Sequence, residues 1–327
     1  MIIDTHSHII TNSYLDELSD RSEVPRIEDK GDGVYTIHCS DYLSYDFDER
    51  MYDLDRKLKD MEKAGIDKQI ISIAMPGVNN LEPKKAVNLA KSVNNEIEQV
   101  VSDKPESFDG VATLPFIAVE EALNELDRVI NDLNLKGISL SSNIGGRGLD
   151  DEDFWPIYQK VSDLGIPILI HPTVPIMGDK LTNYGLNTVV GFVFDSTVAT
   201  LNMVFGGVFE NFPDLKVVVP HAGGTIPYLI KRIDHQYDIN PNCRQKISKK
   251  PSEYLKSIYV DTAQSTCDTS MSCVRSLIGA ENIVFGSDYP FCSLVDSVNS
   301  VKEIGFSEEE KKNVFEETTK KIFNLEK

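Results

Sequence analysis

The sequence predicts a single α/β domain folded as a (β/α)8 TIM barrel, with a small insertion after the first strand. Short runs rich in β-branched residues alternate with longer helical patterns in eight units, which indicates a parallel sheet closed into a barrel. No G-x-G-x-x-G follows the first strand, which disfavours the alternative of a doubly wound open sheet. The length of 327 residues is common for one α/β barrel, so we expect one domain over 1–327.

The first half of the chain supplies four of the predicted strands, at about 1–4, 69–74, 108–114 and 137–140. A helix is expected before the second strand, because Leu54, Leu58 and Met61 recur at spacings of four and three. Gly65 should end this helix, as glycine often follows the last helical residue. The helices predicted in this half cover about 53–64, 83–102 and 119–133.

The second half supplies the other four strands, at about 167–170, 216–219, 258–260 and 282–285. Helices are predicted at about 153–164, 195–211, 226–235 and 268–277, followed by a charged helical region at 296–327. Long loops are expected at 141–148 and 172–194. The first is rich in glycine but lacks the Lys-Ser/Thr of a phosphate-binding loop, so no nucleotide site is predicted there.

Residues 11–50 interrupt the β/α rhythm and form the predicted insertion. The stretch is polar, aromatic and rich in turn residues, and Asp32-Gly33 is flanked by alternating apolar and polar residues. That pattern favours a β-hairpin, so we expect a small hairpin or lid. His38 lies in the alternating pattern and is interpreted as a structural residue of a strand.

The acidic composition limits the possible partners. A net charge of −19 and a pI of about 4.7 argue against binding to nucleic acid or to an anionic membrane surface, but not against a small anionic substrate in a locally positive pocket. The five cysteines form no C-x-x-C pair, which disfavours a zinc ribbon or a disulfide framework. Without a signal-peptide pattern or a run of 18 apolar residues, we expect a cytoplasmic protein.

Histidine and aspartate follow the predicted strands in a pattern that indicates a metal site. Asp4, His6 and His8 alternate at the first strand, so they should share one face. His171 and Asp288 follow the fifth and eighth strands, and barrel active sites lie at these carboxyl ends. Imidazole and carboxylate suit zinc and neighbouring divalent metals, and a catalytic zinc has about three protein ligands and an open position. Taken alone, D-x-H-x-H is also compatible with a polar strand end carrying two incidental histidines.

His221 follows the sixth strand and is the remaining histidine expected at the barrel mouth. Histidine is a common general acid or base at physiological pH, so this residue could serve that role beside the metal ligands. Asp288 could either add an oxygen ligand or act as a base.

Several motifs at these positions resemble the amidohydrolase superfamily. They are D-x-H-x-H on the first strand, I-H-P at 170–172, P-H-A-G-G at 220–224 and G-S-D-Y-P-F at 286–291, and the run at 206–217 is also similar. More narrowly, the chain resembles the amidohydrolase-related branch, which contains aminocarboxymuconate semialdehyde, resorcylate and carboxyvanillate decarboxylases, and some hydratases and lactonases.

The resemblance implies one divalent metal, most often zinc with manganese as the alternative, bound by His6, His8, His171 and Asp288. Asp4 is expected as a further ligand or a supporting residue, and His221 as the acid/base residue. Decarboxylases of the branch also hold the substrate carboxylate with arginines. Arg232 resembles one that reaches the neighbouring subunit's site, which implies a homodimer or higher homo-oligomer. Lys57, beside Arg56, stands where the other arginine is expected, so we predict substrate binding for Lys57 despite this departure.

The expected function is non-oxidative decarboxylation of a small aromatic or unsaturated carboxylic acid. The same ligands would also serve hydrolysis of a lactone, ester or amide, or hydration of a double bond. A metal-binding scaffold or sensor without activity is disfavoured, because such a protein would not need a free histidine such as His221.

Overall fold

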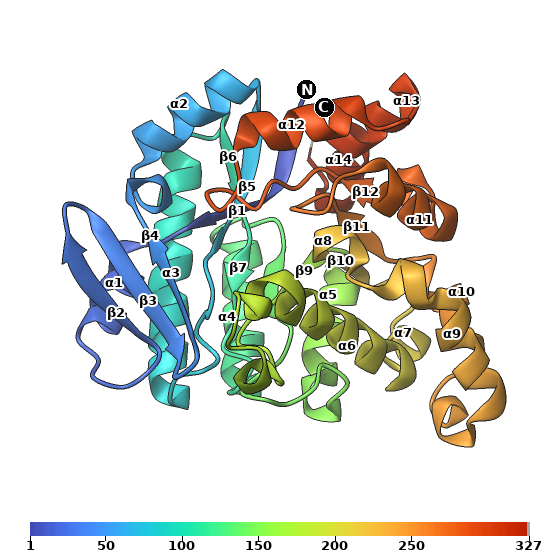
Figure 1. The fold of residues 1–327 in the computed structure, drawn as a ribbon. Coiled ribbons are helices and arrows are strands. Elements are labelled where there is room, and N and C mark those ends of the chain that lie inside the picture. The colour runs from blue at the N-terminus through green and yellow to red at the C-terminus, as the bar shows by residue number, and fades with distance from the viewer. Residues whose placement is uncertain (326–327) are drawn as a thin grey trace.

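The computed structural model describes residues 1–325, and their parallel strands close into the predicted barrel (Figure 1). The strand positions are β1 (Ile3–Ile9), β5 (Lys68–Ile73), a third strand split into β6 (Phe108–Gly110) and β7 (Ala112–Thr113), β8 (Ile138–Ser141), β9 (Pro167–His171), β10 (Lys216–Val219), β11 (Tyr259–Asp261) and β12 (Ile283–Val284). Each strand pairs in parallel with the next strand in this order, within the two arcs β1-β5-β6 and β7 to β12. The Thr5 amide donates to the Phe285 carbonyl over 2.8 Å, and Ser7 pairs with Tyr289, which closes the barrel between its first and last strands.

Helices surround the barrel on its outer side (Figure 1). They are α2 (Leu54–Ala64), α3 (Pro83–Asp103), α4 (Val119–Asn131), α5 (Trp155–Leu164), α6 (Phe192–Phe205), α7 (Val208–Asn211), α9 (Ile226–Ile239), α10 (Pro251–Leu255), α11 (Asp268–Ile278), α12 (Leu294–Glu303), α13 (Glu308–Lys312) and α14 (Thr318–Phe323). The short segment α8 (Pro220–Gly223) instead follows the end of β10, and its residues His221 and Ala222 have left-handed backbone angles. The apolar faces of the surrounding helices pack on the strands in one large cluster, whereas Ile322 and Phe323 of α14 belong to a second, smaller one. As predicted, Gly65 ends α2, in a left-handed conformation that favours glycine.

Two predicted elements have clearly different bounds in the structure. The first strand extends to Ile9, so His6 and His8 lie within it rather than after it. The helix predicted at 195–211 begins earlier and breaks at Gly206–Gly207, where Gly207 has a φ of +85°. A side chain at Gly206 would come within 2.2 Å of the Asp150 Cβ, so this break is also a point of close packing.

The insertion consists of helix α1 (Asn12–Ser19) and an antiparallel sheet of β2 (Arg26–Gly31), β3 (Val34–Ser40) and β4 (Leu43–Phe47), beside the barrel (Figure 1). The hairpin predicted at Asp32-Gly33 joins β2 to β3, and both residues have a positive φ, as a tight two-residue turn requires. Ile37 and Phe47 are buried on its inner face. His38 contacts Glu28 and Ser44 within the sheet, in agreement with a structural role.

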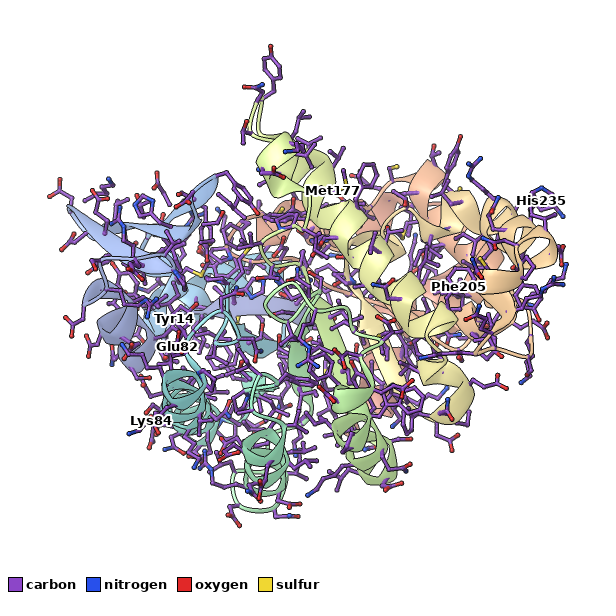
Figure 2. All side chains as sticks on the ribbon, turned by 90° about the horizontal axis from the view of Figure 1, so that it is seen from below. Tyr14, Glu82, Lys84, Met177, Phe205 and His235 are labelled. Atoms are coloured by element: carbon purple, nitrogen blue, oxygen red, sulfur yellow. The ribbon has the colours of Figure 1, made fainter. Side chains whose placement is uncertain are left out.

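One helical stretch of the described chain, Asn187–Phe205, is long and apolar enough to cross a membrane by length and composition alone. It comprises α6 and the turn before it, and 44% of its most apolar window is buried in the protein. Met203 and Val204 belong to the core, which is typical of a barrel helix. Figure 2 shows Phe205 at the end of this helix and the exposed Met177 in the loop that precedes it.

Candidate metal centre and active-site pocket

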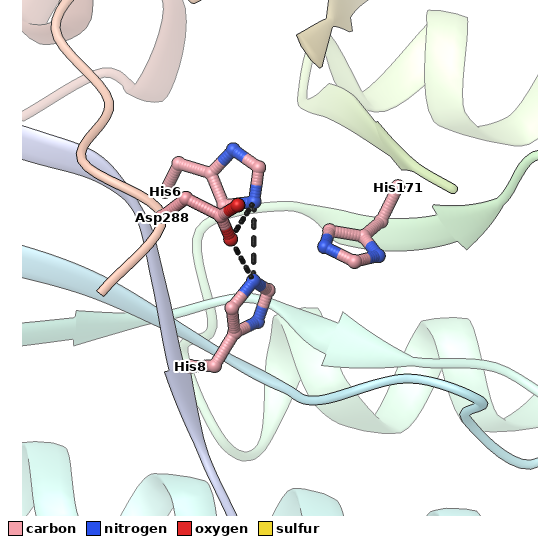
Figure 3. A group of neighbouring side chains, drawn as sticks. All are labelled: His6, His8, His171 and Asp288. Carbon is pink, nitrogen blue, oxygen red and sulfur yellow. Dashed lines mark hydrogen bonds and ion pairs between the residues drawn. The ribbon is translucent and has the colours of Figure 1, made fainter. Parts of the chain in front are cut away.

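Four side chains from three strand ends converge at the mouth of the barrel (Figure 3). His6 and His8 come from β1, His171 ends β9, and Asp288 follows β12. One ligand atom from each lies within 4.8 Å of the others. The Nε2 atoms of His6 and His8 are 3.1 Å apart, and the Asp288 Oδ1 is 3.1 Å from the His8 Nε2 and 3.3 Å from the His6 Nε2. They are four of the five residues predicted to bind the metal, and the fifth, Asp4, lies outside this group in the described chain.

The hydrogen bonds of the Nδ1 atoms of the three histidines indicate that the four side chains fit a divalent metal. The His6 Nδ1 donates to the Asp261 carboxylate over 2.7 Å, and the His171 Nδ1 donates to the Pro172 carbonyl over 2.7 Å. The His8 Nδ1 lies 3.2 Å from the Ser72 hydroxyl. When Nδ1 carries the proton of a neutral imidazole, Nε2 has the free lone pair, which faces the cluster. Three imidazole lone pairs and one carboxylate oxygen then meet, which is a donor set for zinc or manganese.

Burial and mutual charge decide the protonation of the cluster. Burial lowers the pKa of His8, and burial together with the neighbouring histidines holds the pKa of His171 well below its usual range, which favours neutral ligands. Burial would also lower the pKa of His6, but the carboxylates of Asp288 and Asp261 raise it well above its ordinary value. Burial opposes ionisation of Asp288, but the charge of His6 and hydrogen bonds from His221 and His6 hold its pKa well below the usual range. A divalent metal bound by the His6 ring would therefore displace the extra proton of that ring.

His221 lies beside the cluster without belonging to the four ligands, as predicted. Its Nε2 is 3.5 Å from the Asp288 Oδ2, and its side chain is buried. Within the described chain its Nδ1 has no hydrogen-bond partner. His221 and Asp288 both adopt left-handed backbone conformations, with φ values of 56° and 61°, which are costly for residues other than glycine. This strain at two adjacent site residues is typical of a functional site.

Asp261, at the end of β11, is a site residue that sequence reasoning missed. Its Oδ2 accepts from the His6 Nδ1, and its Oδ1 accepts from the backbone amides of His221 and Ala263 over 2.8 and 3.0 Å. One buried carboxylate therefore orients both a predicted metal ligand and the segment that carries His221. Its place at a strand end, like that of His171, was the signal that could have identified it.

Asp261→Asn should weaken metal binding about 10- to 100-fold, the usual cost of losing a partner of a metal ligand. An amide has one acceptor where the carboxylate has two, so a donor would face either the His6 Nδ1 or the backbone amides. Titration of the metal against a competing chelator measures the effect, with Asp163→Asn on α5 as the control. Equal metal affinities in wild type, Asp261→Asn and Asp163→Asn would show that Asp261 does not position His6.

A cavity of about 470 Å³ opens from the cluster toward solvent. His171, His221 and Asp288 lie at its polar end. Its walls carry aromatic side chains from three regions: Tyr45 from the insertion, Phe192 from α6, and Phe291 from the loop after β12. The cavity is of the size that binds small organic ligands. The insertion thus forms part of the pocket wall.

Asp4 was expected as a further metal ligand or as a supporting residue, and its contacts agree with the supporting role. The pairing of β1 with β5 shifts between Asp4 and Ser7, which indicates a β-bulge, and a bulge breaks the two-residue alternation. The Asp4 oxygens accept from the Gln69 side chain over 2.8 Å and from the amide and hydroxyl of Ser287 over 2.9 and 2.6 Å. Asp4 is absent from the converging group in the described chain. It fixes the segment before Asp288 to β1 and so supports the site.

Lys57 does not occupy the position predicted for a substrate-binding residue. It is 1% exposed, and its Nζ donates to the Ser7 hydroxyl over 2.9 Å and to the His8 carbonyl over 3.0 Å. The ammonium also lies 4.3 Å from the centre of the Tyr289 ring. Lys57 is not among the residues that line the cavity. Because α2 packs on the outer side of β1, Lys57 braces the strand that carries His6 and His8.

Burial lowers the pKa of Lys57 to about 7 from the ordinary value of 10.5. Between these pH values the unfolded chain holds a proton that the folded protein has lost, so Lys57 makes stability rise with pH across this window. Lys57→Met should remove this increase in the free energy of unfolding, which is at most about 1.4 kcal/mol per pH unit. Urea unfolding from pH 6 to 9.5 measures it, with the exposed Lys59→Met as control. Parallel stability curves for wild type and Lys57→Met would contradict this account.

Arg232 lies on α9 and is exposed, and it does not line the cavity of its own chain. Its predicted contact with substrate requires a second copy of the protein, and both that contact and the homo-oligomer stay predictions.

A (β/α)8 barrel with four converging metal ligands and a histidine beside them defines a class of metal-dependent barrel enzymes. The chain belongs to the amidohydrolase family, whose model matches residues 3–325. It is 36% identical over 238 residues to a 2-amino-3-carboxymuconate-6-semialdehyde decarboxylase of Dictyostelium discoideum, an alignment that covers 71% of this chain and 66% of that relative.

Solved structures have the same fold. The 5-carboxyvanillate decarboxylase of Sphingomonas paucimobilis superposes with a TM-score of 0.88 at 23% identity, and 99% of each chain is covered. A dihydroxybenzoic acid decarboxylase of Polaromonas, with bound manganese and the inhibitor 2-nitroresorcinol, gives a TM-score of 0.83 at 23% identity over 99% of this chain and 97% of that one. These likenesses establish the fold, and the converging His and Asp side chains of this chain support a divalent metal.

Proposed function

We propose that this protein is a metal-dependent, non-oxidative decarboxylase of a small aromatic or unsaturated carboxylic acid. The observation that carries the proposal is the four-ligand cluster at the end of an aromatic-walled cavity of about 470 Å³, with His221 beside it. A planar acid fits such walls, with its polar end toward the cluster. The decarboxylase names of the similar proteins support the same chemistry.

In the reaction, the bond between the carboxylate and its carbon breaks, and its electron pair stays on that carbon. Carbon dioxide leaves, and the carbon takes up one proton. A bound divalent metal, zinc or alternatively manganese, would supply positive charge that holds a substrate oxygen and favours the developing negative charge. The protein supplies the proton from the pair formed by His221 and the Asp288 Oδ2, which are 3.5 Å apart. The aromatic walls orient the ring and exclude water from it.

A substrate panel tests this proposal. Protein loaded with zinc or manganese is incubated with 2,6-dihydroxybenzoate, other hydroxybenzoates, muconate-like acids and a set of lactones. We expect carbon dioxide release from at least one acid and no acidification from the lactones. Lactone hydrolysis or hydration of a double bond, with no carbon dioxide from any acid, would contradict the proposal.

A further inference from the structure

Gln264 contacts the candidate centre from the turn after β11. Its Nε2 donates a hydrogen bond to the Asp288 Oδ2, and its side chain lines the cavity. Because a carboxylate accepts hydrogen bonds and cannot donate them, the amide nitrogen has to face Asp288. The carbonyl end of the amide is then directed elsewhere. Within residues 1–325 nothing donates a hydrogen bond to it, so it can accept one from a molecule in the cavity.

The contact divides the two oxygens of Asp288 between two tasks. Oδ1 lies 3.1 and 3.3 Å from the Nε2 atoms of His8 and His6, at the metal cluster. Oδ2 faces the Gln264 amide and, at 3.5 Å, the His221 Nε2. The hydrogen bond from Gln264 restrains the plane of the carboxylate, so that one oxygen faces the metal cluster while the other faces Gln264 and His221.

The backbone at Gln264 indicates that this placement is not incidental. Its φ is +51°, a left-handed conformation that costs free energy for glutamine, and the residue is exposed, so core packing does not require it. The turn is tied to the centre, because the Asp261 carboxylate accepts from both the Ala263 amide and the His6 ring. Gln264 is thus held at a fixed distance from the cluster.

We propose that Gln264 is a positioning residue for Asp288 and a specificity-determining residue for the substrate. Its carbonyl accepts a hydrogen bond from a hydroxyl or amino group on the ring, and it disfavours a second carboxylate at that place. The preference for such a donor-bearing acid rests on the proposed function, whereas the positioning of Asp288 does not.

The test compares wild type with Gln264→Met, which keeps the side-chain length without polar atoms, and with Gln264→Gly, which relieves the left-handed backbone. Gln159→Met is the matched control, because the Gln159 Nε2 also donates to an aspartate, Asp163, on the surface of α5 at 2.8 Å. Manganese affinity should fall about tenfold in both Gln264 variants and stay unchanged in the control. The melting temperature of Gln264→Gly should not fall, which separates positioning from general loss of structure.

The role of Gln264 in specificity is tested by calorimetry, which measures the affinity of the manganese-loaded proteins for two probes, resorcinol and 1,3-dimethoxybenzene. Only resorcinol has hydroxyl donors. Wild type should bind resorcinol about three- to tenfold more tightly than the dimethoxy probe, and Gln264→Met should lose that preference. Equal binding of both probes by wild type would overturn the specificity role, and unchanged manganese affinity in both variants would overturn the positioning role. Neither measurement requires catalysis. Their outcome is therefore distinguishable from a failure of the protein to release carbon dioxide.

Discussion

His221→Asn is expected to lower kcat for decarboxylation by about 10²- to 10⁴-fold while the protein keeps its metal. The Nε2 of His221 lies 3.5 Å from the Asp288 Oδ2, yet His221 is not among the four converging ligands. Asparagine cannot carry the proton, but it tolerates the left-handed backbone at this position, where φ is 56°. The loss should therefore fall on the proton-transfer step rather than on folding.

Metal content and kcat are measured on the same preparation of His221→Asn. His235→Asn, on α9, serves as the control and should keep both. Near-normal kcat with full metal content would assign the proton to another group. Loss of the metal would instead place His221 among the ligands.

His8→Ala should abolish both metal binding and activity, with a fall in activity of at least about 10³-fold. His8 is fully buried, and its Nε2 lies against both Asp288 and His6, so the substitution removes a ligand and leaves a cavity in the cluster. Wild type should gain about 3 to 4 kcal/mol of stability at metal concentrations of 100 to 1,000 times Kd, because only the folded state has the site.

Thermal unfolding with and without zinc or manganese measures that gain. His8→Ala should show no gain, whereas His38→Ala, in the insertion and outside the cluster, should show the full one. Removing the metal from wild type with a chelator should abolish activity, and adding it back should restore activity. A chelator-resistant activity would show that the four residues do not hold a catalytic metal.

The barrel and the ligand set could be predicted from the sequence because both depend on periodic or local signals. Apolar periodicity identified all eight strand positions, although the third is split at Val111. The carboxyl ends of parallel strands meet at one face, so His171 and Asp288 could be placed beside His6 and His8 without coordinates. The hairpin at Asp32-Gly33 followed from the backbone that a two-residue turn requires.

The positions of individual site residues were harder to predict than the strands, because they depend on local features that a regular strand or helix pattern does not contain. The bulge in β1 breaks the alternation, so the Asp4 side chain contacts Ser287, Gln69 and the His6 backbone amide rather than the side chains of the cluster. The depth of Lys57 depends on how α2 packs against β1, which its spacing along the helix does not fix. Asp261 is the last residue of the three-residue strand β11, and Gln264 lies in the turn after it. Neither residue belongs to a repeating pattern, and for that reason both were missed.

The most direct test of the central claim uses 2,6-dihydroxybenzoate, or the best acid of the panel, labelled with ¹³C at the carboxyl carbon. The metal-loaded protein is incubated with it in deuterated water, and gas and organic product are analysed by mass spectrometry and NMR. The predicted result is ¹³C-labelled carbon dioxide and a product with one deuterium on the carbon that lost the carboxylate. Retention of the label in an organic acid that has gained water, with no labelled gas, would contradict decarboxylation at this centre.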